Sequence, residues 1–217
     1  MSLPRNIDAL LNTARVATSN ALSSPKILEY LAVYGYAPAK IQQGFSLYET
    51  AQAAQQKQKA EYGEQIGATV VLNEAWETAN KSYIKFLKIA RITFKDDAGI
   101  ATQLGLSGSR KDSLSGWLMQ AQQFYSNLLN NADLIKRLNE FGITADKLKA
   151  GQSELQAVET ANLVQTKEKG ESQNATKVRD TVVDSLSAWL SDFIAIGRIA
   201  LEEEPQLLES LGILQRS

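Results

Sequence analysis

The stretch KFLKIARITFKDDAGIATQLGLSG, residues 85–108, decides the fold, because a second version of it, DFIAIGRIALEEEPQLLESLGILQ, stands at residues 192–215. When the sequence is aligned with itself at an offset of 107 residues, the register holds without a gap from residue 1 to residue 107. The alignment contains 25 identities in 107 pairs, whereas unrelated sequences of ordinary composition match at about one position in sixteen. The sequence therefore predicts a tandem duplication of a unit of ~107 residues.

Each copy has the apolar periodicity of helices. A first helix is predicted from about residue 6 to residue 23, because its apolar residues recur at helical spacing, and the equivalent positions of the second copy repeat the stripe. A short helix then opens at Ser24-Pro25 and ends before Gly35, whose equivalent is Gly142. Longer helices are predicted from about residue 38 to 62 and from about residue 68 to 95, and a further short helix closes each copy.

Two matching segments are interpreted as turns between the longer helices. They are GEQIGAT at residues 63–69 and GESQNAT at residues 170–176. Since each flanking helix carries one apolar stripe, the two helices of a copy are expected to form an antiparallel hairpin. The outer halves of these hairpins are polar, so we expect them to reach into solvent and to be available to a partner or to a second copy of the chain.

The predicted fold class is all-α: a pseudo-twofold helical bundle with four long helices and several short ones. The first helical repeat covers residues 1–107 and the second covers residues 108–217, and we expect them to pack together as one domain. Two independent domains in tandem are the alternative. Ala90 and Gly197 occupy equivalent places on the stripes of the longest helices, and these small residues lead us to expect a close crossing of the two helices near the pseudo-twofold axis.

The composition excludes several classes of function. The chain contains neither cysteine nor histidine, which excludes disulfides, thiolate nucleophiles, a Ser-His-Asp triad and histidine-ligated metals. The 23 basic and 24 acidic residues nearly cancel, so no general field attracts nucleic acid or an anionic membrane. Without a long apolar segment, we expect a soluble, cytoplasmic protein that binds neither nucleic acid nor membrane.

The candidate interaction residues are Arg91 and Arg198, which are equivalent in the two copies. A duplicated guanidinium could bind an anion, but each arginine could also shield the apolar stripe with its stem, with Glu202 near Arg198 as an ion-pair partner. The acidic runs 96–97 and 202–204 could offer oxygen ligands to a hard metal, or could serve as acidic residues at the start of the next helix. We assign no catalytic, cofactor-binding or metal-binding residue, and no cofactor.

Three functions remain open at the level of the sequence. The first is a non-enzymatic helical-bundle interaction or scaffold protein, because helical bundles without catalytic side-chain types act mainly through their surfaces. The second is a carrier of a small apolar ligand between helices. The third is an enzyme that uses carboxylates and a hard metal, since acid and base catalysis does not require histidine.

Overall fold

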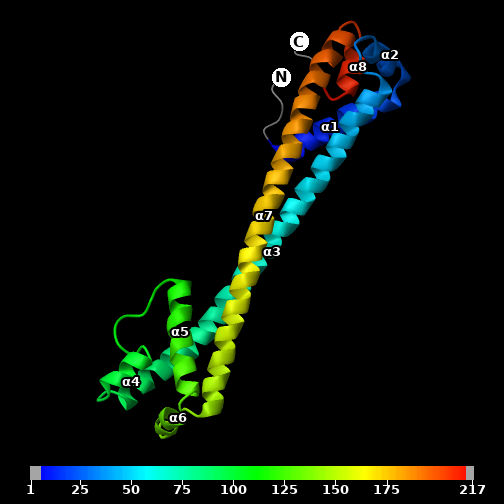
Figure 1. The fold of residues 1–217 in the computed structure, drawn as a ribbon. Coiled ribbons are helices and arrows are strands. Elements are labelled where there is room, and N and C mark those ends of the chain that lie inside the picture. The colour runs from blue at the N-terminus through cyan, green and yellow to red at the C-terminus, as the bar shows by residue number, and fades with distance from the viewer. Residues whose placement is uncertain (1–5, 214–217) are drawn as a thin grey trace. The chain divides into compact units, whose positions relative to one another are not determined.

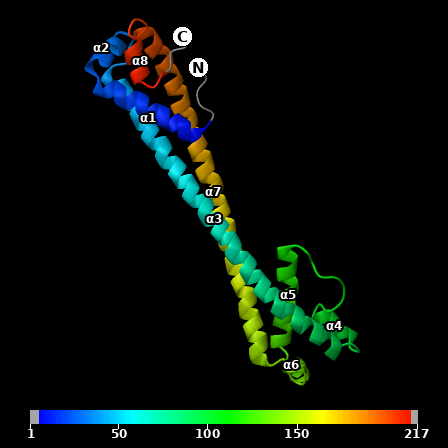
Figure 2. The same cartoon turned by 180° about the vertical axis from the view of Figure 1, so that it is seen from behind.

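The computed structural model describes residues 6–213, and within this range the chain forms helices and no strands (Figures 1 and 2). The prediction of an all-α fold is confirmed. No helix in this range is both long enough and apolar enough to cross a bilayer. In chain order the helices are α1 (Ile7–Ser23), α2 (Pro25–Val33), α3 (Pro38–Thr93), α4 (Ala98–Gln103), α5 (Leu114–Leu129), α6 (Ala132–Asn139), α7 (Ala145–Ala200) and α8 (Pro205–Ser210).

Polar caps begin the shorter helices. The side-chain oxygens of Asn6, Ser24 and Asp97 accept hydrogen bonds from backbone N–H groups in the first turns of α1, α2 and α4. These N–H groups have no acceptor within their own helix, so the caps stabilise the starts. Gly35 and Gly142 follow the ends of α2 and α6 with φ of 80° and 73°, the left-handed conformation that glycine adopts without strain. Both predicted glycine caps are confirmed.

The two long helices correct the predicted hairpins. α3 and α7 contain 56 residues each and continue through both segments that were expected to turn. The prediction of four long helices is therefore wrong. Gly63, Gly67 and Gly170 all lie inside these helices, and a Cβ atom added to any of them would have no neighbour within 4 Å. Each glycine costs about 1 kcal/mol relative to alanine without breaking the helix. The surrounding Ala, Gln, Glu and Lys residues favour helix and carry it through.

The chain divides into two compact units. Among the described residues, unit 1 comprises residues 6–63 and 170–213, and unit 2 comprises residues 64–169. α3 and α7 each contribute one half to each unit. Unit 1 therefore combines the first part of the first predicted repeat with the last part of the second predicted repeat, and unit 2 combines the remaining parts.

The core of unit 1 joins α1 and the first half of α3 to the second half of α7. Ala14, Ala17 and Ala21 on α1 are fully buried and allow the helices to approach closely. On α3, Gly44 faces the indole ring of Trp189 from α7, and a Cβ at Gly44 would overlap that ring. We call this space the Gly44 notch.

The core of unit 2 is richer in aromatic side chains. Tyr83 of α3 packs edge to face against Trp117 and Phe124 of α5, with ring centroids 5.9 and 5.5 Å apart. On α7, a Cβ at Gly151 would lie 2.5 Å from the hydroxyl oxygen of Tyr125 on α5. This space is the Gly151 notch, and it is filled by a ring from a different helix than the ring in the Gly44 notch.

Gly197 has different neighbours from those expected. It belongs to unit 1, whereas Ala90 belongs to unit 2. Gly197 instead faces the side chains of Ile213 and Leu211, which would lie 3.6 and 3.9 Å from an added Cβ. These are ordinary van der Waals distances, so the position has room for a methyl group.

Two alanine substitutions on α7 should have opposite effects. Gly151→Ala should lower the free energy of unfolding by about 1 kcal/mol, because overpacking against the buried ring of Tyr125 exceeds the gain in helix propensity. Gly197→Ala should raise it by about 0.5–1 kcal/mol, because the methyl group fits and the helix gains. Urea denaturation of both variants and the parent measures the difference, and a change of the same sign in both would contradict the two environments described here.

Candidate functional site

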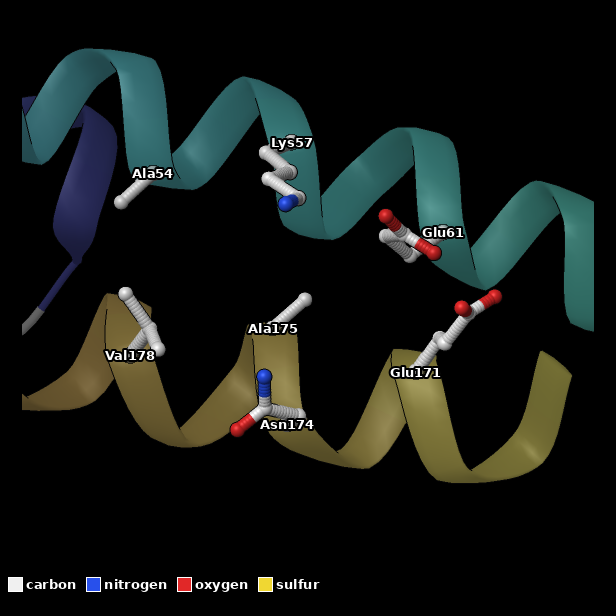
Figure 3. Close-up of a pocket in the computed structure, with 7 residues that line it drawn as sticks. All are labelled: Ala54, Lys57, Glu61, Glu171, Asn174, Ala175 and Val178. Atoms are coloured by element: carbon white, nitrogen blue, oxygen red, sulfur yellow. The ribbon is translucent and has the colours of Figure 1, made fainter. Parts of the chain in front are cut away.

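A small pocket lies between α3 and α7 within unit 1 (Figure 3). Its volume is about 200 Å³, and its lining comprises Ala54, Lys57, Glu61, Glu171, Asn174, Ala175 and Val178. The lining residues of α3 follow one another at three- and four-residue intervals, as do most of those of α7, so each helix presents one face to the pocket. The pocket is thus a product of the continuous helices.

The pocket is lined by both polar and apolar side chains and carries charges of both signs. Figure 3 shows the carboxylates of Glu61 and Glu171 approaching from opposite helices, and a carboxylate oxygen of one lies within 4.8 Å of one from the other. Lys57 lies one helical turn before Glu61 on α3 and adds a positive charge to the same lining. Two carboxylates, an amide and an ammonium group suit a small polar solute better than the apolar ligand of the carrier hypothesis, because apolar ligand pockets are larger and mostly lined by apolar side chains.

Tyr125 carries a buried hydroxyl in unit 2. Its side chain is 1 % exposed, and its hydroxyl has no hydrogen-bond partner among the described residues. Burial raises the pKa of Tyr125 well above the ordinary tyrosine value, and the nearby charge of Glu154 and the neighbouring Tyr83 add to the effect. The phenol therefore remains neutral and acts as a packing group.

Arg91 is engaged in backbone contacts. Its Nε donates to the carbonyl of Leu106 at 2.7 Å, and its Nη2 donates to the carbonyl of Gly108 at 3.3 Å. The guanidinium thereby ties the end of α3 to the segment that follows α4. The equivalent Arg198 is partly buried near the end of α7, and the ion pairs of the described residues do not join it to Glu202. The structure does not bring the two arginines into one unit.

The two acidic runs have different structural contacts. The Asp97 carboxylate accepts a hydrogen bond from the Ile100 N–H at 3.0 Å and caps α4. Glu204 precedes α8 and accepts a hydrogen bond from Lys26 of α2 at 2.7 Å. The bond to Lys26 lowers the pKa of Glu204, and the same bond raises the pKa of Lys26. Lys26 is exposed and Glu204 is partly exposed, so solvent screens the pair.

The sequence did not predict the pocket of unit 1. Its α7 residues lie in segment 170–176, which was interpreted as a turn, or directly after it. α3 and α7 were not expected to face each other there. A signal was present in the alignment, because Glu61 matches Glu168 and Glu64 matches Glu171. These matching glutamates lie close to the pocket in the sequence, but they do not indicate which helices pack against each other there.

Comparison with family models, with curated proteins and with solved structures found no match to this chain. The functional interpretation therefore depends on the residues and the geometry described above.

Replacing Tyr125 with Phe should show how much of the free energy of unfolding depends on the packing of the ring and how much depends on the ionisation of the hydroxyl. At about pH 8, Tyr125→Phe should change the free energy of unfolding by less than about 1 kcal/mol, because the hydroxyl makes no hydrogen bond. Above the ordinary tyrosine pKa of 10.0, the unfolded parent loses this proton while the folded parent keeps it, so the parent loses stability as the pH rises. The variant should lose less over the same range.

Urea denaturation at about pH 8 and about pH 11 measures this difference, for which each titrating proton contributes at most about 1.4 kcal/mol per pH unit. The buried Tyr83 and Tyr36 also have raised pKa values, so part of the alkaline loss should remain. Tyr62→Phe, at an exposed tyrosine, is the control. Equal alkaline losses in the parent and in Tyr125→Phe would contradict the assignment.

Proposed function

We propose that the protein is a non-enzymatic helical interaction protein that arose by tandem duplication and presents the same kind of apolar contact residue once in each unit. The observation that carries this proposal is that large apolar side chains are exposed at equivalent positions of the two copies. Tyr34 and Phe141 are 47 % and 53 % exposed, and Ile92 and Ile199 are 64 % and 54 % exposed.

The duplication is supported by the helix bounds. α3 and α4 begin and end 107 residues before α7 and α8, and the left-handed glycines Gly35 and Gly105 recur as Gly142 and Gly212. A tertiary contact also recurs: the Asn20 side chain donates to the carbonyl of Ser210 at 2.6 Å in unit 1. The equivalent Asn127 donates to the carbonyl of Gln103 at 2.6 Å in unit 2. Such agreement supports a common ancestor for the copies and a pseudo-twofold relation between them.

The exposed aromatic residues are suited to be anchors. Tyr34 and Phe141 each stand directly before a left-handed glycine, at the end of α2 and of α6, so the backbone holds them in a defined place. Aromatic side chains often contribute most to the binding energy at protein interfaces because they bury much surface at little cost in side-chain entropy. We infer a protein partner that supplies apolar side chains to these anchors.

Three polar side chains from the segments singled out in the sequence have structural contacts. Arg91 binds backbone carbonyls, Asp97 caps α4, and Glu204 pairs with Lys26. This use of the candidate groups supports an interaction protein over a carboxylate enzyme. The cytoplasmic location and the association with a second copy stay predictions.

The proposal is tested by affinity capture from an extract of the source cells with quantitative mass spectrometry. Tyr34→Ser and Phe141→Ser should each weaken retention of the captured partner, and the double variant should lose it, because two weak contacts on one chain bind with added avidity. Exposed positions of this kind change stability by only about 0.5 kcal/mol. Ser46→Ala with Ser153→Ala, also exposed and equivalent, is the matched control. Equal capture by the parent and the Tyr34/Phe141 double variant would overturn the proposal.

A further inference from the structure

We propose that a small set of side chains determines which segments of the chain pair, namely the rings in the Gly44 and Gly151 notches together with one indole hydrogen bond. The inference uses the 107-residue equivalence of the proposed duplication and does not depend on the proposed surface. It assigns Trp189, Tyr125 and Trp117 a role in choosing between two ways to fold the same helices.

The two ways differ in how four segments combine. In the structure, segment 6–63 packs with segment 170–213 in unit 1, and segment 64–107 packs with segment 108–169 in unit 2. We call this the exchanged pairing. In a closed pairing, each copy would fold on itself, so 6–63 would pack with 64–107 and 108–169 with 170–213. A Cβ atom added to Gly63, Gly67 or Gly170 would have no neighbour within 4 Å, so packing does not require glycine there. Because glycine adopts turn conformations at little cost, the local sequence also tolerates the turns that a closed pairing needs.

The notches distinguish the two pairings by volume. In the exchanged pairing each notch holds one ring: Trp189 lies in the Gly44 notch and Tyr125 lies in the Gly151 notch. At the equivalent positions the other copy has small residues, Thr18 in place of Tyr125 and Ser82 in place of Trp189. In the exchanged pairing, each of the two glycines is therefore matched with one large and one small side chain.

The closed pairing would break this matching on both sides. In the second copy, Tyr125 and Trp189 would both have to enter the Gly151 notch, which the Tyr125 ring already fills. In the first copy, only Thr18 and Ser82 would face Gly44, which would leave the notch empty. Overpacking and cavities both destabilise a core, so the exchanged pairing is favoured twice.

A partly buried hydrogen bond also favours the exchanged pairing. The indole Nε1 of Trp117 donates to the side-chain oxygen of Asn80 at 2.9 Å in unit 2. In a closed pairing Trp117 would face Ser187, and Asn80 would face Leu10, as the 107-residue offset requires. Asn80 would then place an amide against an apolar side chain and lose its donor, which costs free energy for a buried polar group.

Two other contacts between the segments do not distinguish the exchanged pairing from the closed pairing. The bonds of Asn20 to Ser210 and of Asn127 to Gln103 join equivalent groups, so the same two bonds could form in either pairing. They stabilise the units without choosing a partner. Selection therefore depends on positions where the copies have diverged.

The test moves the large side chain from one copy to the other in the full chain. The first variant combines Trp189→Ser with Ser82→Trp, which makes the closed pairing the one with a single ring in each notch. A second variant combines Tyr125→Thr with Thr18→Tyr and should have the same effect from the other side of the notch. All four substitutions together return one ring to each notch in the exchanged pairing. Asn20→Ala with Asn127→Ala is the control, since it weakens contacts that do not select.

Cysteine cross-linking reads the pairing, because the chain has no native cysteine. Lys57→Cys with Ala175→Cys reports the exchanged pairing, since these residues face each other across the pocket in Figure 3. Lys57→Cys with Ala68→Cys reports the closed pairing, because Ala68 is the equivalent of Ala175. In continuous α3, residues 57 and 68 lie about 16 Å apart along the helix axis, beyond a thiol cross-linker that spans about 10 Å, the separation of packed helices.

In the parent and in the control, the 57/175 cross-link should dominate. In each double variant the ratio of 57/175 to 57/68 cross-links should fall by about tenfold or more, equivalent to about 1.4 kcal/mol, and in the quadruple variant it should return. If a double variant does not fold, recovery of helical circular dichroism and of the 57/175 cross-link in the quadruple variant still supports the proposal. An unchanged ratio in folded double variants, or a quadruple variant that does not recover, overturns it.

Discussion

Gly44 and Gly151 each leave room for one aromatic ring beside a packed helix, and in the proposed pairing the arrangement of this chain depends on that constraint. Gly44 receives Trp189 from α7, and Gly151 receives Tyr125 from α5. The two rings come from the same copy of the proposed duplication, yet they occupy notches in different units. Once each ring has a notch of its own, the first part of each copy must pack with the last part of the other. Since α3 and α7 then supply one half to each unit, both run as continuous helices of 56 residues.

The sequence predicted those features of the fold that depend on neighbouring residues. The starts at Ser24-Pro25 and at Asp97 and the ends at Gly35 and Gly142 follow from local capping chemistry, and the structure contains them. The turns at 63–69 and 170–176 were predicted wrongly because the local sequence there is compatible with both a turn and a helix. That choice depends on the partners of side chains such as Trp189 and Gly44, which lie 145 residues apart in the chain and carry no local signal.

The candidate site shows the same limit. Asp97 was correctly considered as a residue at a helix start, because a cap acts within three residues. The partner of Glu204 is Lys26, far away in the chain, and the carbonyls that bind Arg91 come from the segment after α4. The pocket of Figure 3 requires the faces of α3 and α7 to meet. A periodic stripe predicts that a face is buried, but it does not identify the face opposite.

In the proposed account, sequence differences between the two copies favour the exchanged pairing over the closed pairing. With two identical copies, every contact between segments would be available to both pairings, as the bonds made by Asn20 and Asn127 still are. The exchanged and closed pairings would then differ only in their turns and in the cost of glycine inside a helix, a matter of about 1 kcal/mol for each glycine. The second copy has both large rings, and the first copy has the small Thr18 and Ser82. A closed pairing would therefore overpack the second copy and leave a cavity in the first. In the proposed pairing, the positions at which the two copies have different residues therefore determine which segments pack together.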